Sequence, residues 1–421
     1  MSPIIRWVIK MNFSEEQRKA INSDEPFLFL QACAGSGKTR VIVEKVKRLI
    51  FEGVNPEDIL CITFTKKASI EMAERLENRT NDVYTFHQFC LNELKKNTVY
   101  PYDIFEPDDF SFSPYELLMI SRYKNSLYRI RKPNSYNKYQ MFLKSKHLKD
   151  FDDLLIDYLK IHISKHYSYL FIDEFQDTNE LQYQVLKKLI SCHTKVFAVG
   201  DPNQSIYRFR GSNYKIIHQF VHEYKASVLT LSTNYRSTKP IVHIANQLII
   251  NNPKRDYLSM NPSIDGYEDV ESISFYNLEQ ESLYVTDLLI SIIQKNSNLT
   301  TAILYRNHKR AFHLKNHLYE LDDYRLQIED TIHFLTIHQS KGLEFDVVVM
   351  IGLEQGELPS LNDNQMIELE EERRLCFVGM TRAKKKLILT HVRLDDQRHI
   401  HTPSVFLKES HVKTHDYMPI K

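Results

Sequence analysis

The chain of 421 residues and 49.9 kDa exceeds what one hydrophobic core of about 100–200 residues supports, so we expect two or three domains. Its 42% hydrophobic and 26% charged residues are typical of a globular protein, and 55 basic against 54 acidic side chains exclude a uniformly basic nucleic-acid coat. The five cysteines form no CxxC pair, which excludes the usual zinc spacing and a dense disulfide framework.

Short β-branched runs alternate with longer amphipathic stretches along the chain, which is the pattern of an α/β protein. Two segments break the alternation. Residues 100–120 contain several prolines and predict a domain junction, and residues 251–266 contain asparagine, proline and glycine and predict a polar loop. Six apolar runs of strand length are interpreted as parallel strands, most of them buried on both faces. In chain order these runs are 26–32, 58–65, 167–174, 195–201, 301–306 and 345–353.

The compartment is predicted from what the chain does not contain. No apolar run approaches the about 18–20 residues of a membrane span, and Arg6 and Lys10 interrupt the short apolar stretch at the N-terminus, which makes it a poor signal peptide. We therefore expect an intracellular protein, cytoplasmic or nucleoid-associated, or nuclear in a eukaryote, and not a secreted one.

The first apolar run ends at a P-loop, the sequence ACAGSGKT of residues 32–39, and a helical segment follows it. Small residues let consecutive backbone N–H groups surround a β-phosphate at a helix N-terminus. Lys38 then supplies a cation to the β- and γ-phosphate oxygens, and the Thr39 hydroxyl binds Mg²⁺. Ala32 replaces the first glycine of the pattern GxxxxGK[ST], and the alternative is a tight glycine-rich turn without a ligand. The predicted phosphate cradle is Ala34, Gly35, Ser36 and Gly37.

Two acidic residues, Asp173 and Glu174, follow the third apolar run. A P-loop enzyme needs an acid on a neighbouring strand, so we expect Asp173 to hold Mg²⁺ and Glu174 to orient or deprotonate the attacking water. By themselves, two adjacent carboxylates at a strand end are more often a solvated loop or a helix cap. Together with the P-loop they predict ATP hydrolysis with Mg²⁺ as the metal.

These motifs and further blocks in the expected order resemble the superfamily 1 DNA helicases of the UvrD/Rep/PcrA type over nearly the whole chain. The family's P-loop reads AGAGSGKT, so Cys33 stands for a glycine and Ala32 is accounted for. The blocks of the first half are MNFSEEQRKAI (11–21), ACAGSGKTR (32–40), TFTKKASIEM (63–72), TFH (85–87), DEFQDT (173–178) and GDPNQSIYRFRG (200–211). Those of the second half are NYRST (234–238), TIHQSKGLEFDVV (336–348) and EEERRLCFVGMTRAKKKL (370–387).

The resemblance implies a nucleotide site to which two domains contribute. Arg236 and Arg382 match arginines that contact the γ-phosphate in the family, and charge delivered from a second domain reports the phosphate state by opening or closing a cleft. The alternative for each arginine is a surface salt bridge. Gln204 would position the water or sense the γ-phosphate. On the base side the resemblance assigns Gln17 to the adenine edge, Tyr235 to stacking on adenine, Glu344 to the ribose and Arg40 to the flank of the base.

The same blocks predict a track for single-stranded DNA, because bases stack on aromatic rings while cations and hydroxyls contact the backbone. Phe209 stands where the family usually has tryptophan, so we expect weaker stacking there. Phe64 fits a core position as well as a stacking one. The predicted DNA contacts are Thr63, Phe64, His87, Tyr207, Phe209, Thr336 and His338.

Residues 122–149 carry nine lysines and arginines and no acid, with four tyrosines between them. This pattern predicts nucleic-acid contact, and the alternative is a solvated helical face. The segment lies where the family inserts its first accessory domain, so we expect contact with single/double-strand junctions.

Between Arg306 and Thr336 lie 29 residues, too few for a folded domain of about 50, so the family's large second insertion is expected to be absent. Residues 1–10, with the sole tryptophan, are interpreted as a candidate extension upstream of Met11, where the family often begins.

We therefore expect an α/β protein of two RecA-like P-loop domains with parallel sheets and one small, mostly helical insertion in the first. The expected bounds are 1–99 and 150–228 for the first domain, 100–149 for the insertion and 229–421 for the second domain. The expected function is that of an ATP-dependent DNA helicase, by resemblance moving 3′ to 5′ and serving repair or replication.

Other functions stay open on the sequence alone. An ATP-gated single-stranded-DNA-binding module or translocase that does not unwind fits the absent insertion, and a strand-separation assay on a 3′-tailed duplex distinguishes the two. A small-molecule kinase built on the P-loop leaves the blocks of the second half unexplained. The motifs do not distinguish RNA from DNA as the track.

Overall fold

A computed structural model describes most of the chain as two compact units. The first comprises the residues up to Ala32 together with Gly37–Leu231, and the second comprises Ser232–Lys421 together with Cys33–Ser36. The described residues are 13–80, 82–97, 102–105, 112–162, 165–213, 215–252, 258–266, 268–296, 298–319, 331–360, 365–395 and 397–418. The predicted extension 1–10, Trp7 and Met11 lie outside them.

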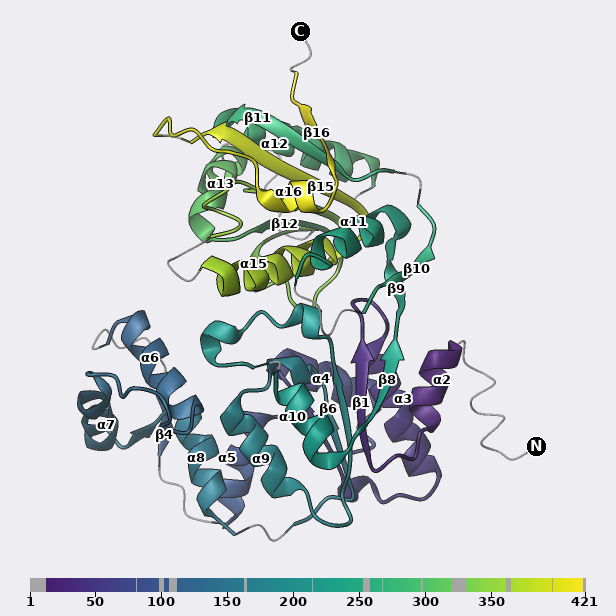
Figure 1. Cartoon of the computed structure of the whole chain (residues 1–421), viewed down its shortest axis with the longest axis vertical. Coiled ribbons are helices and arrows are strands. Elements are labelled where there is room, and N and C mark those ends of the chain that lie inside the picture. The colour runs from purple at the N-terminus through teal and green to yellow at the C-terminus, as the bar shows by residue number, and fades with distance from the viewer. Residues whose placement is uncertain are drawn as a thin grey trace. The chain divides into compact units, whose positions relative to one another are not determined.

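The first unit is built on a six-stranded parallel sheet of order β3-β2-β6-β7-β1-β8 (Figure 1). The strands are nearly continuous runs of buried apolar residues, as expected where helices cover both faces of a sheet. Their bounds are β1 Phe27–Ala32, β2 Ile59–Thr63, β3 Val83–Thr85, β6 Tyr169–Ile172, β7 Lys195–Gly200 and β8 Ser227–Leu231.

Helices cover both faces of this sheet, so the unit has two apolar cores. One face packs against α5 (Phe86–Asn97), α8 (Phe151–Lys160), α9 (Glu180–Leu189) and α10 (Lys215–Tyr224). The other packs against α2 (Glu15–Asn22), α3 (Lys38–Phe51) and α4 (Lys66–Arg75). Short 3₁₀ turns lie between these elements: η1 (Pro56–Asp58) before β2, η2 (Phe175–Asp177) after β6, and η3 (Pro202–Gln204) and η4 (Arg208–Arg210) after β7.

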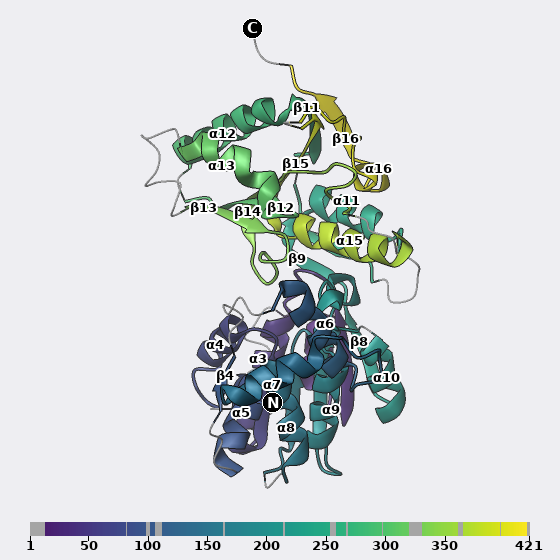
Figure 2. The same ribbon diagram turned by 90° about the vertical axis from the view of Figure 1, so that its left-hand side faces the viewer.

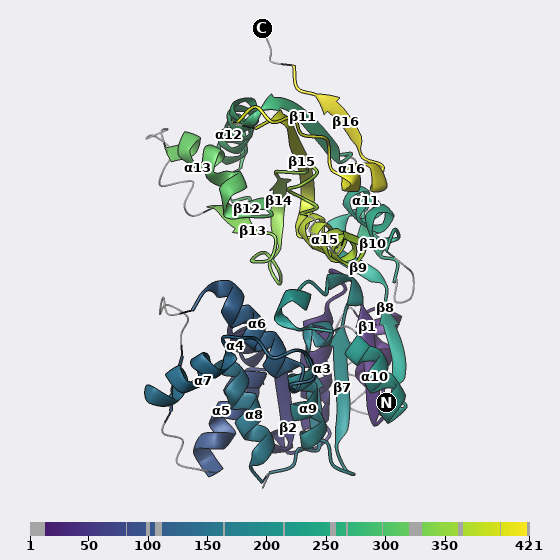
Figure 3. The same cartoon turned by 60° about the vertical axis from the view of Figure 1, so that its left-hand side comes forward.

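A small segment between α5 and α8 has its own core of five buried side chains: Phe105, Phe112, Ile120, Tyr139 and Leu143. It contains α6 (Pro114–Asn125) and α7 (Tyr136–Ser145), beside α8 in Figure 3, and the short parallel pair β4 (Asp103–Ile104) and β5 (Leu148–Lys149). Ser113 and Glu116 form a capping box at the start of α6, with proline at its first turn. We call this part, residues 102–105 and 112–149, the accessory segment.

Neither the predicted nucleic-acid contact of the cations in residues 122–149 nor the alternative, a solvated helical face, holds for Lys124. This side chain is 0% exposed, and its Nζ lies 2.7 Å from both Asp150 and Asp153. Lys149 is also engaged, at 2.9 Å from Asp157. Both cations are neutralised by acids of α8 or of the residue before it, so the basic pattern of this segment is partly a structural ion network.

The same network raises the pKa of Asp152 to about 7, through burial and then through the charge of Asp150, against hydrogen bonds from Ser121 and Asn125 and the charge of Lys124. When the pKa of a carboxyl group is higher in the folded protein than in the unfolded chain, the folded protein loses stability as the pH rises from the unfolded-state pKa to the folded-state pKa. As the pH rises from 4 to 8, we therefore expect the unfolding free energy of the Asp152→Asn variant to increase relative to that of the wild type by on the order of 1 kcal/mol or more. Urea unfolding at both pH values measures this, and an equal difference at the two pH values would contradict it.

The second unit is a six-stranded parallel sheet of order β13-β12-β14-β15-β11-β16 (Figure 2). Its strands are β11 Glu271–Asn277, β12 Thr301–Tyr305, β13 Ile332–Thr336, β14 Phe345–Met350, β15 Ala383–Leu394 and β16 Lys413–Asp416. On one face lie α12 (Leu278–Lys295) and α13 (Phe312–Tyr319), the latter preceded by η5 (His308–Ala311). On the other lie α11 (Lys239–Ile249), α15 (Gln365–Met380) and α16 (Val405–Glu409).

A separate parallel pair joins β9 (Thr233–Thr238) to β10 (Asn261–Ile264). The prediction of a polar loop over residues 251–266 is therefore wrong for residues 261–264. The backbone N–H of Asn261 donates to the carbonyl of Ser232, and the Ser263 hydroxyl donates to the carbonyl of Asn234. These bonds to β9 and to the residue before it hold a polar sequence in strand geometry.

Both sheets are parallel and mixed with helices, which confirms the predicted α/β class. All six predicted strands are present, with ends that differ from the prediction by at most three residues. Among the residues that the structure describes, no helix is both long and apolar enough to cross a membrane.

Candidate active site

The P-loop turns between β1 and α3 through two glycines in the left-handed region, Gly35 at φ 68° and Gly37 at φ 81°. Residues with a Cβ rarely adopt this backbone conformation, so glycine is needed at both positions. The Ser36 hydroxyl donates to the carbonyl of Cys33 at 2.8 Å, which closes the turn. Because α3 begins at Lys38, its first backbone N–H groups lack carbonyl partners within the helix. The local geometry is that of an anion-binding loop at a helix N-terminus.

Side chains from two strand ends meet beside this loop. Lys38 and Thr39 follow β1, Asp173 and Glu174 follow β6, and β7 lies between those strands. The Thr39 hydroxyl donates to Asp173 Oδ2 at 3.0 Å, and Lys38 Nζ lies 4.0 Å from Glu174 Oε1. The structure therefore brings together four residues that the sequence assigned to ATP and Mg²⁺, within the first unit.

The carboxyl of Asp173 is buried beside the P-loop. Burial and the adjacent charge of Glu174 raise its pKa to about 6, although Lys38, the backbone N–H of Glu174 and the Thr39 hydroxyl oppose the rise. In the described residues, no group of three or more histidine, cysteine or acidic side chains is placed to hold a metal by itself. One carboxylate and one hydroxyl nonetheless suit Mg²⁺, which prefers oxygen ligands and commonly completes its shell with water and substrate phosphates. The residues present fit such an ion.

Glu174 sits in a backbone conformation that a non-glycine residue seldom adopts, at φ 51° and ψ 41°. Such positions cost roughly 1–3 kcal/mol and persist only where the surroundings hold them. Here the amide of Gln176, which is fully buried, donates to the Glu174 carboxylate. The side-chain oxygen of Gln176, Oε1, in turn accepts from the backbone N–H of Asp201 at 2.9 Å.

Gln204 joins this chain of bonds through Asp201. Its amide nitrogen donates to Asp201 Oδ2 at 2.6 Å, and both residues are buried. The bonds therefore run from Glu174 through Gln176 and Asp201 to Gln204. Sequence reasoning assigned no role to Gln176 or Asp201. Their presence in the DEFQDT and GDPNQS blocks was the available signal.

On the other side of the P-loop lie the residues assigned to the base. Gln17 forms a capping box with Ser14 at the start of α2, and its amide nitrogen would lie 3.2 Å from a Cβ placed on Gly37. The guanidinium carbon of Arg40 lies 4.5 Å from the centre of the Phe13 ring. Gln17 and Arg40 therefore flank the loop from the side of α2.

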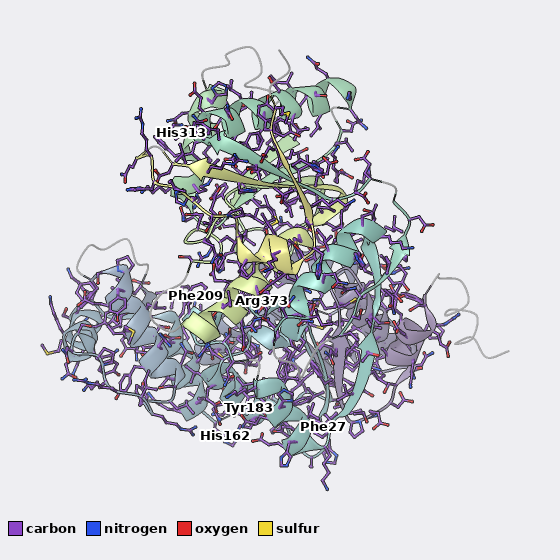
Figure 4. All side chains as sticks on the ribbon, turned by 45° about the horizontal axis from the view of Figure 1, so that its top comes forward. Phe27, His162, Tyr183, Phe209, His313 and Arg373 are labelled. Carbon is purple, nitrogen blue, oxygen red and sulfur yellow. The ribbon has the colours of Figure 1, made fainter. Side chains whose placement is uncertain are left out.

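Three aromatic rings form a row in the first unit. Phe64 and Tyr207 stack with centroids 5.0 Å apart and planes 19° apart, and Phe209 lies 6.1 Å beyond Tyr207. Phe209, labelled in Figure 4, is 39% exposed. Rings in such a row offer faces on which bases stack.

Two predicted DNA contacts of the first unit are placed differently from the expectation. Thr63 is 1% exposed and its hydroxyl donates to the carbonyl of Thr65, so the structure does not present it to a phosphate. His87 packs edge-on against Phe151, and burial lowers its pKa to about 4. Near neutral pH the imidazole is uncharged and donates through one nitrogen only.

In the second unit, Arg236 and Glu344 lie together although they are far apart in sequence. Arg236 Nε donates to Glu344 Oε2 at 2.7 Å, and Lys384 lies 2.9 Å from the other oxygen. Burial raises the pKa of Glu344. Hydrogen bonds from Lys384 and Arg236, together with the charges of those two side chains, outweigh burial, so the pKa is lowered overall. The residues that the resemblance assigned to the γ-phosphate and the ribose are thus paired with each other.

Arg382 is buried and bonded inside the second unit. Its guanidinium donates to the carbonyls of Val378 and Leu343 at 2.9 and 3.2 Å and to the Thr381 hydroxyl at 3.3 Å. Arg236 also reaches the carbonyl of Thr381, at 3.2 Å. The two arginines assigned to the γ-phosphate therefore meet at one residue, Thr381, and Arg382 also supports the local fold.

The remaining predicted residues of this unit lie in a strand or at the end of one. Tyr235 in β9 is 42% exposed. Thr336 ends β13, where its hydroxyl exchanges hydrogen bonds with the side chain and backbone of Gln339. His338 follows in the next turn and is half-buried. Thr336 and His338 thus lie at the carboxyl edge of the second sheet.

Two family models match the chain: the UvrD/REP helicase N-terminal domain over residues 13–105 and 105–225, and the UvrD-like helicase C-terminal domain over residues 229–322 and 318–393. A probable DNA helicase of Mycoplasma pneumoniae is 30% identical, over 96% of this chain and 88% of that protein. The ATP-dependent DNA helicase PcrA of Staphylococcus epidermidis is 28% identical, over 71% of this chain and 48% of its own length. PcrA of Staphylococcus aureus is 31% identical, over 58% and 40%. The matched part of this chain thus spans less than half of the PcrA proteins.

Proposed function

The chain belongs to the UvrD-like superfamily 1 family of ATP-dependent DNA helicases, and we propose that it couples ATP hydrolysis to movement along single-stranded DNA in the 3′ to 5′ direction. The observation that carries this proposal is the set of Lys38, Thr39, Asp173 and Glu174 beside a P-loop, joined through Gln176 and Asp201 to Gln204. We further propose that this activity serves DNA repair or replication.

Hydrolysis follows from the positions of these groups. Lys38 and the N–H groups at the start of α3 compensate the charge of the β- and γ-phosphates. Thr39 and Asp173 would hold Mg²⁺, which supplies further charge stabilisation when bound. Glu174, held by Gln176 and close to Lys38, accepts a proton from the attacking water. Gln204 senses the γ-phosphate, and its bond to Asp201 links that sensor to the carboxylate that acts as base.

We propose that Arg236 and Arg382 act from the second unit on the γ-phosphate, and that ATP closes and its hydrolysis opens a cleft between the units. Arg236 leaves Glu344 for the phosphate in this scheme, and Glu344 is then released for the ribose. Tyr235, Gln17 and Arg40 hold the base. A group that exchanges one partner for another with the nucleotide state is the kind of element that converts hydrolysis into movement.

For the track we propose that bases stack on the row of Phe64, Tyr207 and Phe209, while Thr336 and His338 contact phosphates. The exposed cations of the accessory segment, among them Lys144 and Lys146, then meet the duplex at a junction. The alternative is a translocase or ATP-gated DNA-binding module that does not unwind by itself. The 29 residues between Arg306 and Thr336, too few for a second accessory domain, favour it.

One set of assays tests the proposal and separates the alternatives. We expect single-stranded DNA to stimulate steady-state ATP hydrolysis, the Lys38→Ala variant to lose hydrolysis, and RNA to compete poorly. A 3′-tailed duplex is expected to bind more tightly than the single strand alone, because it also engages the accessory segment. Strand separation from the 3′-tailed duplex and not from a 5′-tailed one would establish direction and unwinding.

Each other outcome identifies a different function. DNA-stimulated hydrolysis without strand separation would establish the translocase. If the protein binds DNA only when ATP is bound, and DNA does not stimulate ATP hydrolysis, the binding module would be established. Hydrolysis that DNA does not change would refute the proposed coupling.

A further inference from the structure

The first half of the P-loop is bonded to β9. The side chain of Asn234 donates from Nδ2 to the carbonyl of Ala34 at 2.8 Å, and the backbone N–H of Tyr235 donates to the carbonyl of Gly35 at 2.9 Å. All of these residues belong to the second unit, which includes Cys33–Ser36. Two consecutive carbonyls of the loop are therefore held by one strand.

The loop and the strand approach each other so closely that no side chain fits between them. A Cβ placed on Gly35 would lie 2.7 Å from Cβ of Arg236 and 2.8 Å from Nδ2 of Asn234, and real Cβ atoms essentially never make contacts this short. Gly35 therefore has a second requirement for glycine besides its positive φ, and β9 imposes it.

The amide of Asn234 has only one possible orientation. Its Oδ1 accepts from the backbone N–H groups of Arg236 at 2.9 Å and Ser237 at 2.8 Å. Because only the oxygen of an amide side chain accepts from N–H groups, Nδ2 must face the loop. There it meets the carbonyl of Ala34 and, at 3.8 Å, the sulfur of Met260. Asn234 is 0% exposed, so its donor is aimed at the loop inside the packed unit.

This chain adds a contact at the position where the family's P-loop has glycine. The thiol of Cys33 is buried, and the nearer of its two acceptors is the carbonyl of Ser232, at 3.3 Å, in the residue before β9. The other is the carbonyl of Ala34, at 3.5 Å. A thiol is a weak donor, so Cys33 contributes less than Asn234 to holding the loop on the strand.

The bonds to β9 decide which way the peptide between Ala34 and Gly35 faces. In a planar trans peptide the C=O and the following N–H point in opposite directions. Because the carbonyl of Ala34 points to Asn234, the N–H of Gly35 points away from β9. Glycine adopts several backbone conformations, so without these bonds the peptide could rotate and turn its carbonyl oxygen toward a bound phosphate. Phosphates bind N–H groups and are repelled by carbonyl oxygens.

We propose that Asn234 is a positioning residue for the nucleotide, which holds the peptide between Ala34 and Gly35 in the orientation that binds the β-phosphate, and that Cys33 assists it. The proposal rests on the proposed function and adds to its nucleotide site. Sequence reasoning assigned no role to Asn234, although it lies in the NYRST block.

The test measures the affinity of the full chain for fluorescent analogues of ADP and ATP in the presence of Mg²⁺. Both nucleotides carry a β-phosphate, and only ATP carries a γ-phosphate. Asn234→Ala is expected to lower the affinity for ADP and for ATP by a similar factor of about 10, because the loop is no longer held for the β-phosphate. Cys33→Ala removes only a sulfur atom and is expected to lower both affinities by about 2-fold.

The matched control is Asn277→Ala. Asn277 is an asparagine of the same unit that also accepts from a backbone N–H, that of Gln280 at 3.0 Å, and it caps the start of α12. Its replacement should lower the stability to urea without changing either nucleotide affinity. Urea unfolding of each variant shows how much stability it has lost.

The two affinities together identify how Asn234 acts. Equal loss for ADP and ATP in Asn234→Ala, with both affinities retained in the control, supports the proposal. A loss confined to ATP would mean that Asn234 acts by placing Arg236 at the γ-phosphate, and this would overturn the proposal. Unchanged affinities in Asn234→Ala, or an equal loss in the control, would overturn it as well.

Two further results keep the test decisive. If Asn234→Ala does not fold, Cys33→Ala decides: a loss for both nucleotides supports the proposal, and unchanged affinities overturn it. If the wild type binds neither nucleotide, the proposed nucleotide site itself fails. A wild type that binds both, with variants that bind them equally well, leaves the proposed function standing and refutes only the role of Asn234.

Discussion

Replacement of Glu174 by glutamine is expected to lower the turnover number of ATP hydrolysis by at least about 100-fold while ATP still binds. Glutamine keeps the shape of the side chain and an oxygen for the bond from Gln176, but it accepts no proton from water. The P-loop and Lys38, which bind the phosphates, are unchanged. Steady-state hydrolysis and the affinity for a fluorescent ATP analogue, measured on the same preparation, check both halves of the expectation.

The matched control is Glu180→Gln, which makes the same chemical change in the first turn of α9, on the segment that follows η2. Glu180 accepts a hydrogen bond from Gln184 within that helix, away from the P-loop, and its replacement should leave turnover within about 2-fold of the wild type. Turnover of the Glu174→Gln variant equal to that of the control would show that another group takes the proton. A loss of ATP binding instead would mean that Glu174 holds Lys38 in place.

The second large effect concerns stability. Lys124→Met is expected to lower the free energy of unfolding by about 3–5 kcal/mol, because it leaves buried carboxylates without their cation. Lys124 is 0% exposed and lies 2.7 Å from Asp150 and from Asp153, and the Tyr139 hydroxyl donates to Asp150 from the same core. Urea denaturation at pH 7, followed by far-ultraviolet circular dichroism, measures the change.

Lys146→Met provides the comparison, since Lys146 is the C-cap residue directly after α7 in the same accessory segment and is exposed. Its replacement should change the unfolding free energy by less than about 0.5 kcal/mol. Adding Asp150→Asn and Asp153→Asn to Lys124→Met removes the unpaired charges and should restore part of the loss. Equal stability of the two single variants would mean that the carboxylates become protonated at little cost when Lys124 is absent.

Lys124 also shows why a basic pattern in sequence is an ambiguous sign of nucleic-acid binding. Its neighbours Arg122, Arg129 and Arg131 are of the same type, and nothing local separates them from it. What separates them is the approach of Asp150 and Asp153, 26 and 29 residues later, when α8 packs against α6. The exposed cations of the segment, among them Lys144 and Lys146, keep the role that we propose for them.

The sequence by itself determined the α/β class, six of the strands and the P-loop with its acidic partners, and the family follows from the same motifs. These features depend on local chemistry: buried parallel strands need apolar runs, and a phosphate loop needs glycines at positive φ before a helix. The six remaining strands of the two sheets were not predicted, among them β15, whose lysines precede its buried part, and the edge strand β16, which is exposed throughout.

Only the tertiary structure decided which residues act together. It joined Glu174 to Gln204 through Gln176 and Asp201, paired Arg236 with Glu344 across 108 positions of the chain, and buried Lys124. The physical reason is that burial, pKa and pairing depend on which distant segments pack together. Residue type and spacing along the chain specify each partner's chemistry, whereas the packed fold specifies which partner it meets.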